Sequence, residues 1–202
     1  MKKLLVLAIA FSTVLMSCKD EKKTETNKEV KYKTVKLATG LNNVDVTMSV
    51  LNWKGSKPTG DHNGTVALKS GGLLVENGKV TAGEFIIDMN SIVNLDMKGK
   101  KGATNIEKHL KSADFFEVAA YPTAKFVITS VTENAGKLSV TGNLNIKDVT
   151  KSITVLATLS EVDGNYIFKS DAFNIDRAEF NVKYKSKKFF DNLKDKFVND
   201  LV

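Results

Sequence analysis

Two histidines are the side chains best suited to acid–base or metal chemistry, and the chain has no others. His62 follows Asp61 and lies between Gly60 and Gly64, in a segment rich in turn-forming residues. A neutral imidazole can take up a proton near neutral pH or bind a metal ion, so His62 could act as a general base or a ligand. The surrounding glycines favour another interpretation, in which the ring binds backbone atoms inside a tight loop.

His109 lies near Glu107 and Asp114, on a stretch for which a short helix is expected. A capping or packing role is favoured, because one histidine on a turn and one on a helix form no local ligand motif. Ser112 could pair with a distant histidine, but the chain contains no nucleophile elbow, phosphate loop or His-Glu-x-x-His pattern. We therefore expect no catalytic residue, metal site or cofactor, and a hydrolase using His62 or His109 is the minority hypothesis.

The position of the single cysteine, Cys18, suggests what its thiol does. It follows an apolar run, residues 4–16, which begins after Lys2 and Lys3. That run is shorter than the roughly 20 residues of a spanning helix, and Ser17 supplies a small residue for signal cleavage. The pattern resembles a bacterial lipoprotein signal, in which the thiol is acylated and becomes the new N-terminus. An ordinary signal peptide with an incidental cysteine is the alternative.

We accordingly expect a signal peptide in residues 1–17 and a flexible tether in residues 18–40. Almost all side chains of residues 19–36 are charged or polar, so this stretch cannot bury enough apolar surface to become ordered. As a random coil it would hold a domain on the order of 20–25 Å from the bilayer. The predicted location is the cell envelope, with the lipid anchor in a bacterial membrane, the outer membrane being favoured, and the domain facing the periplasm or the surface.

Arg177 is the only arginine among 30 basic residues, and the formal net charge is +7. Arginine is the side chain suited to bidentate phosphate contacts, so a surface built from lysine argues against a nucleic-acid partner. The retained guanidinium suggests a bidentate partner of its own. An ion pair with Asp176 or Glu179 that fixes a strand end is favoured over a headgroup contact at a cavity mouth.

From about residue 41 the apolar pattern has a period of two, which indicates β-strands with one buried face. The regular alternations lie at 138–146, 152–159 and 178–185, and less regular strands fit 44–54, 63–69, 79–89, 123–132 and 165–175. Asn77-Gly78, Ala135-Gly136 and Asp163-Gly164 predict tight turns. About eight antiparallel strands suit an up-and-down barrel or a sandwich.

Two stretches have helical features. Thr104 and Glu107 fit a capping box that would open a short helix ending near Lys111. Near the end of the sequence apolar residues recur at helical spacing, but the same segment could also form a strand. Those residues are Phe190, Leu193, Phe197 and Leu201.

Several phrases occur in a fixed order along the chain. They are Trp-Lys-Gly at 53–55, GDHNG at 60–64, GEFIIDM at 83–89, HLKSADFF at 109–116, YPTAKF at 121–126, GNLNIKDVT at 142–150 and Ile-Asp-Arg at 175–177. In this order and spacing the sequence resembles the YceI-like family from about residue 44 onward. The resemblance assigns residues 41–202 to one YceI-like domain.

The resemblance implies an all-β fold: an extended antiparallel β-barrel of about eight strands, lipocalin-like, with one or two short helices and a long apolar cavity. Family members bind elongated amphiphiles such as polyisoprenoid quinones or fatty-acid derivatives, and no catalytic activity is established for the fold as a whole. Relatives usually continue with a final strand near this point. Phe197–Val202 is therefore either a shortened last strand or the sequence is truncated.

The expected function is a membrane-anchored, non-catalytic binding protein for such a ligand, with Cys18 as the lipid attachment site. The alternative is a surface interaction lipoprotein whose barrel is filled, because alternation cannot separate a solid core from a cavity. The oligomeric state stays open. The candidate lining residues are Phe85, Ile87, Phe126, Ile128, Leu138, Val140, Val155, Tyr166, Phe168, Phe180, Val182 and Tyr184.

Overall fold

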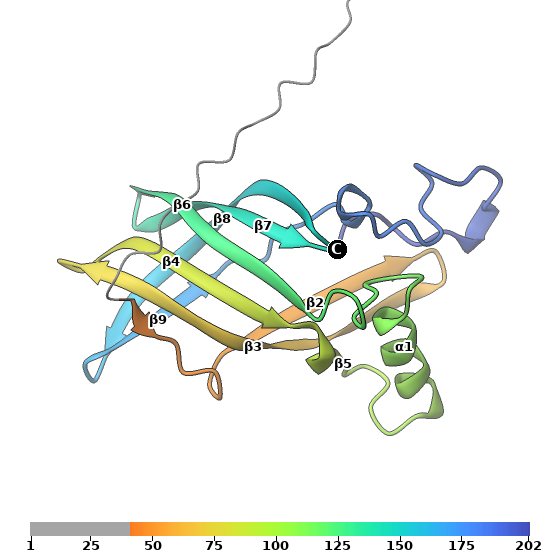
Figure 1. Cartoon of the computed structure of the whole chain (residues 1–202), viewed down its shortest axis with the longest axis horizontal. Coiled ribbons are helices and arrows are strands. Elements are labelled where there is room, and N and C mark those ends of the chain that lie inside the picture. Colours follow the sequence, from red (N-terminus) through yellow and green to blue (C-terminus); the bar gives the residue numbers. More distant parts are fainter. Residues whose placement is uncertain (1–40) are drawn as a thin grey trace, which may run out of the picture. The chain divides into compact units, whose positions relative to one another are not determined.

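Antiparallel strands dominate the regular secondary structure of the computed structural model, which describes residues 41–202 (Figure 1). The predicted signal peptide, Cys18 and the tether lie outside the described residues. The strands are β1 (Asn42–Asn43), β2 (Val50–Lys57), β3 (Gly60–Glu76), β4 (Lys79–Asp88), β5 (Val93–Asn94), β6 (Thr123–Asn134), β7 (Lys137–Ile146), β8 (Val149–Val162) and β9 (Asn165–Ser170). The helices are α1 (Lys101–Lys111) and the short 3-10 turns η1 (Met89–Ser91), η2 (Arg177–Phe180) and η3 (Lys194–Lys196). Among the described residues no helix is long and apolar enough to cross a membrane.

Five hairpin turns connect neighbouring strands within residues 41–202, and four of them place two successive residues at positive φ. Asn77-Gly78, Ala135-Gly136 and Asp163-Gly164 do so with glycine second, which confirms the three predicted turns. Such backbone angles match the right-handed twist of the flanking strands. The fourth turn, Lys147-Asp148, has φ values of 49° and 59° without any glycine.

The strands form one sheet in the order β1-β3-β4-β6-β7-β8-β9, with β2 and β5 paired to the first half of β3 (Figure 1). The sheet is curled. Phe85 on β4 and Phe168 on β9 stack with their ring centroids 6.1 Å apart, although three strands separate β4 from β9 in the sheet. The prediction of an all-β antiparallel fold is confirmed, in the form of a curled half-barrel with one α-helix.

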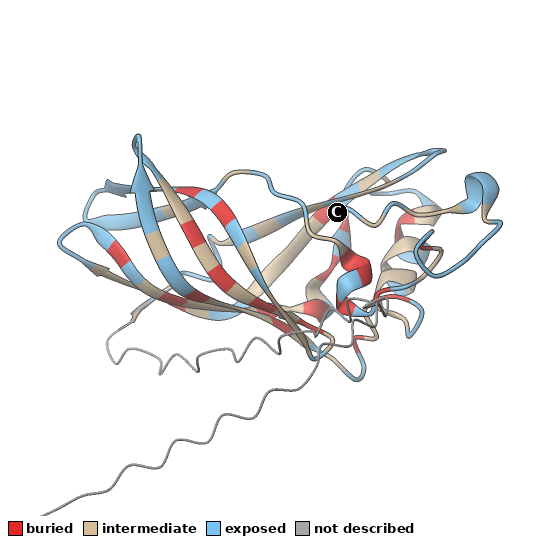
Figure 2. Ribbon diagram, turned by 90° about the horizontal axis from the view of Figure 1, so that it is seen from above, coloured by how far each residue is buried: buried red, intermediate tan, exposed pale blue. Residues whose placement is uncertain are grey.

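Two groups of buried apolar side chains form the core, and in Figure 2 the buried positions recur along the strands. The helix-end cluster comprises Ile87, Met89, Ile92, Val118, Ala124, Leu144, Ile146 and Phe180. The strand cluster comprises Leu73, Val80, Ile128, Val140, Val155 and Ala157. Phe126 and Ile153 pack against both groups, whereas Leu110 of α1 packs only against the helix-end cluster.

Two glycines let aromatic rings lie across the neighbouring strand. A Cβ atom on Gly142 would lie 2.4 Å from Cζ of Phe126, and one on Gly71 would lie 3.0 Å from Cδ1 of Phe85. The rings of β4 and β6 therefore occupy space that any larger residue at these two positions would need. Close approach of this kind is a common reason for glycine inside a strand.

Helix α1 begins at Lys101, three residues before the expected start. Its N-cap residue is Lys100, and Glu107 uses its Oε1 to accept a hydrogen bond from the backbone N of Asn94 at 2.9 Å. The predicted capping box between Thr104 and Glu107 is therefore wrong, because the glutamate binds the β5 strand and Thr104 lies inside the helix. The predicted end of the helix, Lys111, is confirmed.

Residues 178–185 do not form the predicted strand. They continue from η2 into turns, and Asn181 adopts the left-handed conformation with φ of 60°. Phe180 and Val182 are buried, which produced the alternating pattern. Their burial comes from a folded-back backbone, in which the N–H of Val182 donates to the carbonyl of Arg177 at 3.2 Å.

The last described residues form a short ladder rather than the helix that their spacing allowed. Ile175 N donates to Val202 O at 2.8 Å, Val202 N donates back to Ile175 O at 3.0 Å, and Arg177 N donates to Asp200 O at 2.9 Å. Asn199 N donates to Ser56 O of β2 at 2.9 Å. This segment, which we call the closing ladder (residues 199–202), therefore connects β2 with the chain that follows β9.

Candidate functional site

The inner face of the half-barrel is apolar because alternate residues of neighbouring strands point toward it. The register places Phe85 opposite Phe126, and Val140 opposite Val155. Directly opposed residues of an antiparallel pair lie on the same face, so the apolar rows of adjacent strands join. The inner face is consequently a continuous surface that extends from β3 to β9.

Burial differs across this face. Val140 and Ala157 have no exposed surface and Ile128 has 3%, so the centre of the strand cluster is fully covered by its neighbours. Larger side chains around it keep part of their surface exposed, namely Phe85, Phe126, Leu138, Leu159 and Phe168. Apolar area of this kind remains available to an apolar ligand.

Most of the predicted lining residues lie on this face. They are Phe85, Ile87, Phe126, Ile128, Leu138, Val140, Val155 and Phe168. Tyr166 is opposite Glu161 near the β8–β9 turn, where it is 42% exposed. Contact between any of these residues and a ligand stays a prediction.

The remaining three lie elsewhere, since their strand does not exist. Phe180 belongs to the helix-end cluster through η2. Val182 is fully buried, and its carbonyl accepts a hydrogen bond from Arg177. Tyr184 packs edge-on against His109, with ring centroids 4.4 Å apart. Their placement in the row of barrel-lining strand residues was therefore wrong.

Sequence reasoning missed Leu73 and Val80, which belong to the strand cluster. The register shifts between Leu74 and Val75, so the strict alternation that identifies an inner face is broken there. The bulge inserts an extra residue, which a period-two search cannot follow.

Charged groups are confined to the ends of the inner face among the described residues. Lys151 is opposite Leu144, and its Nζ lies 3.9 Å from Glu179 near η2. Glu133 and Glu161 lie on the inner register close to the hairpin turns at the other end, where both are exposed. The middle of the face therefore offers only apolar contacts, and polar recognition is restricted to its ends.

His62 is held in a local hydrogen-bond network. Its Nδ1 lies 2.9 Å from Oδ2 of Asp96, whose Oδ1 accepts from Asn63 N at 2.9 Å and from Asn94 Nδ2 at 2.6 Å. The hydrogen bond from the Asn63 backbone, followed by that from His62, lowers the pKa of Asp96 to about 2. The interaction with Asp96 ties β3 to the residues after β5, and it differs from the backbone contact that was favoured.

His109 and Ser112 are likewise occupied. His109 lies between Phe115 and Tyr184, and its Nε2 is 3.9 Å from Asp114. The Ser112 hydroxyl donates to the carbonyl of His109 at 2.8 Å, which satisfies a free carbonyl at the end of α1. Within residues 41–202, no group of three or more His, Cys, Asp or Glu side chains could hold a metal ion.

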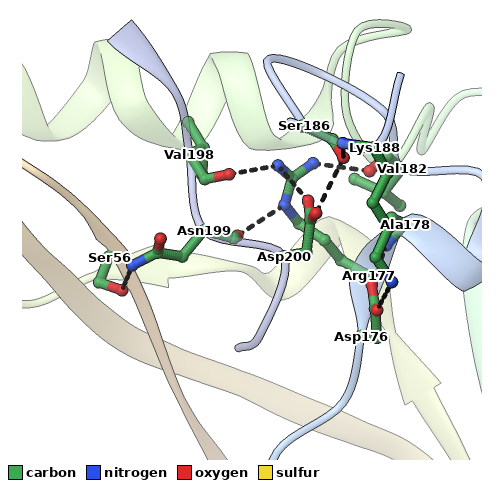
Figure 3. Close-up of polar contacts among 10 residues, drawn as sticks. All are labelled: Ser56, Asp176, Arg177, Ala178, Val182, Ser186, Lys188, Val198, Asn199 and Asp200. Atoms are coloured by element: carbon green, nitrogen blue, oxygen red, sulfur yellow. Dashed lines mark hydrogen bonds and ion pairs between the residues drawn. The ribbon is translucent and has the colours of Figure 1, made fainter. Parts of the chain in front are cut away.

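Arg177 is buried, with 1% of its surface exposed. Figure 3 shows the polar contacts around it. Its Nε donates to Asn199 O at 3.0 Å, its Nη1 to Val182 O at 2.6 Å and its Nη2 to Val198 O at 2.9 Å. The same Nη2 lies 3.1 Å from Oδ1 of Asp200, as an ion pair. The guanidinium group of Arg177 thus holds the closing ladder against the turn that follows η2.

The expectation of a structural arginine fits this geometry, but the ion-pair partner differs. The carboxylate of Asp176 accepts hydrogen bonds from Ala178 N and from Lys188, and Glu179 is paired with Lys151 instead. Burial lowers the pKa of the Arg177 guanidinium, and the negative charges of Asp200 and Asp176 oppose that change.

The fold and its apolar inner face define the class of lipocalin-like antiparallel half-barrels. The chain belongs to the YceI-like family, whose domain matches residues 24–202. The protein YceI of Escherichia coli O6:H1 is 46% identical over 56 residues, which make up 28% of this chain and 29% of that protein. YceI of Salmonella arizonae is 47% identical over 53 residues. The alignments thus span less than a third of the length of these curated relatives.

Two solved structures have the same fold. BcnA of Burkholderia cenocepacia superposes with a TM-score of 0.60 at 23% identity, over 78% of this chain and 93% of BcnA. A polyisoprenoid-binding domain from Saccharophagus degradans, implicated in plant cell wall breakdown, superposes with a TM-score of 0.58 at 18% identity. That match covers 80% of this chain and 92% of the domain.

Proposed function

We propose that this protein is a membrane-anchored, non-catalytic binding protein for an elongated amphiphile, such as a polyisoprenoid, a quinone or a fatty-acid derivative. The apolar chain of the ligand would lie along the inner face between β4 and β9. Its polar end would lie at one of the two ends of that face, where the charged side chains are found.

The continuous apolar inner face is the observation that carries this proposal. The exposed parts of Phe85, Phe126 and Phe168 would be buried by a ligand chain, which is favourable by roughly 25 cal/mol per Å² of apolar surface. The polyisoprenoid-binding domain of Saccharophagus degradans has the same fold, which supports an isoprenoid as the ligand class.

Extraction of the purified protein with organic solvent, followed by mass spectrometry, tests the proposal. Protein produced in a host rich in isoprenoids should carry a stoichiometric amphiphile. The Phe85→Ala/Phe168→Ala variant should retain several-fold less, because two apolar contacts on opposite sides of the ligand are lost. Leu156→Ala is the matched control, since Leu156 is 48% exposed and faces away from the inner face. Absence of any amphiphile from repeated wild-type preparations would contradict the proposal.

Attachment to the membrane would come from acylation of Cys18. The apolar run before this cysteine and the polar stretch after it support an anchor followed by a spacer. Cys18→Ala protein should fold normally but move from the membrane fraction to the soluble fraction of the producing cells. Wild-type protein lacking a lipid adduct on Cys18 in mass spectra would remove the anchor from the proposal.

A filled half-barrel that binds a protein partner is the second candidate. The stack between Phe85 and Phe168 favours it, because the two rings bridge the inner face from opposite strands. A ligand between β4 and β9 must separate these rings. The filled form predicts that the rings keep their contact in every preparation and that no amphiphile is extracted.

A further inference from the structure

Two adjacent phenylalanines, Phe189 and Phe190, remain about half exposed, at 48% and 49%. They belong to a segment after η2 that we call the lysine–phenylalanine loop (residues 183–196). The loop is dark blue in Figure 1, at the end of the molecule that carries α1. Single exposed apolar residues are common, whereas contiguous exposed apolar surface rimmed by polar groups is typical of interaction sites.

A buried serine holds the turn that presents these rings. Ser186 has no exposed surface, and its hydroxyl donates to Oδ2 of Asp200 at 2.9 Å and accepts from Lys188 N at 3.1 Å. Its carbonyl accepts from Phe189 N at 3.1 Å and from Phe190 N at 3.0 Å. The fold therefore fixes the pair in an outward position.

The loop is strongly cationic. It carries six lysines and only two aspartates, a net charge of +4. The lysines are Lys183, Lys185, Lys187, Lys188, Lys194 and Lys196. Within the described part of the chain, Lys188 is the one lysine of the loop in an ion pair, with Asp176. The Nζ of Lys183 lies 4.7 Å from the centroid of the Phe189 ring, so positive charge directly borders an exposed ring.

An open hollow of about 360 Å³ lies beside the pair. Lys183 and Lys185 share its wall with Phe190 and Leu193, and Asp114 contributes the one carboxylate. A group seated there would lie beside two lysine side chains and an apolar surface. That combination suits a phosphate attached to acyl chains.

We propose that the lysine–phenylalanine loop docks on the surface of an anionic phospholipid bilayer. Phe189 and Phe190 enter the interface between headgroups and acyl chains, and the lysines bind lipid phosphates, one of them in the hollow. Basic residues beside exposed aromatic side chains are the composition of interfacial membrane contacts. This docking is separate from ligand binding on the inner face, and its test does not depend on whether a ligand is found.

Tryptophan fluorescence of the full chain tests the docking. The Phe190→Trp variant is mixed with vesicles whose phospholipids carry brominated acyl chains, which quench only tryptophans that enter the bilayer. The Ile167→Trp variant is the matched control, because Ile167 is 50% exposed on β9 and lies outside the loop. The wild-type signal of Trp53 is subtracted, and every sample carries the same N-terminal segment.

With phosphatidylglycerol vesicles, Phe190→Trp should shift its emission to the blue and be quenched several-fold more than Ile167→Trp. The difference should shrink in phosphatidylcholine vesicles and when salt rises from about 0.1 M to about 1 M, as the Debye length falls from about 10 Å to about 3 Å. Introducing Lys183→Gln/Lys185→Gln into both tryptophan variants should also reduce the difference in quenching. Introducing Lys79→Gln/Lys169→Gln should leave that difference unchanged.

Equal quenching of the two tryptophan variants, or quenching that ignores lipid charge, would overturn the proposal. A blue shift that appears without vesicles and grows with protein concentration would assign the loop to contact between copies of this chain instead. If the emission of Phe190→Trp does not change on anionic vesicles and the loop captures an acidic protein instead, the loop is a site for a protein partner.

Discussion

At the scale of single residues, one arginine organises more of the structure than any candidate catalytic side chain. Arg177 donates to the carbonyls of Val182, Val198 and Asn199 and lies against the carboxylate of Asp200. A lysine has a single ammonium group and cannot reach these acceptors together. This explains why a chain otherwise built with lysine has an arginine here.

Replacing this arginine should destabilise the protein. Arg177→Met removes the counter-ion of Asp200 and the donor to three carbonyls, so the free energy of unfolding should fall by about 3–5 kcal/mol. Urea denaturation followed by circular dichroism measures this change. Lys137→Met, which removes an exposed pair with Asp171, should cost no more than about 1 kcal/mol. Equal losses for the two variants would contradict the assigned role.

The low pKa of Asp96, about 2, makes part of the stability depend on pH. A carboxyl whose pKa is lowered by folding stabilises the folded state above its unfolded pKa of 3.8, and that contribution is lost as pH falls toward 2. Thermal unfolding of Asp96→Asn should therefore show a weaker loss of stability between pH 4 and pH 2 than the wild type. Asp171→Asn serves as the control, and an unchanged slope for Asp96→Asn would be evidence against the network.

At the scale of elements, packing between the strands depends on glycine as well as on apolar residues. Gly142 on β7 lies beneath the ring of Phe126 on β6, which lets that ring pack against both core clusters. The pattern of alternating residues does not reveal this, because a glycine in the apolar row reads as a gap.

Adding one methyl group at this position should therefore be costly. A Cβ in Gly142→Ala would lie 2.4 Å from the Phe126 ring, and the displaced ring should reduce the free energy of unfolding by about 1–3 kcal/mol. Gly55→Ala on β2 is the matched control, since its Cβ would meet nothing closer than 4.0 Å. Chemical denaturation of both variants decides the point, and a stable Gly142→Ala protein would show that the ring can move freely.

Much of the sheet could be predicted from local sequence. Alternation located β7 and β8, and three turn dipeptides located the hairpins, because backbone twist and one-sided burial act within a few residues. The strand predicted for residues 178–185 is wrong for a reason that local sequence does not show. Their burial depends on Arg177 binding residues 198–200, about twenty residues away, so the local alternation of apolar residues there does not come from a strand.

At the scale of the whole molecule, the half-barrel is joined at one end by the closing ladder. Residues 199–202 bond to residues 175–177, and Asn199 also bonds to Ser56. In the strand order, β2 and the segment after β9 do not pair with each other. Residues 199–202 connect them. Asp200 of the closing ladder also accepts the hydrogen bond from Ser186, which connects the lysine–phenylalanine loop to it.

Loosening the closing ladder should be visible in hydrogen exchange. Asp200→Ala removes the acceptor of Ser186 and the counter-ion of Arg177. The amides of Ile175, Arg177 and Val202 should therefore exchange at least ~10-fold faster. That change corresponds to about 1.4 kcal/mol of local stability. Amides of the β6–β7 hairpin should keep their rates. Asp195→Ala, an exposed position in the same region, is the control, and identical exchange in both variants would refute the connection.

The bonds from Asn199 to Ser56 also set an order of events during synthesis. The β3–β4 and β6–β7 hairpins join neighbouring stretches of chain, so they can pair as soon as both strands have been made. The bond to Ser56 spans 143 residues and must wait until Asn199 has been made. Contacts between residues so distant in sequence form slowly. A nascent chain halted before residue 199 would therefore have paired hairpins but an unfinished end, and its apolar inner residues would be exposed to chaperones and proteases.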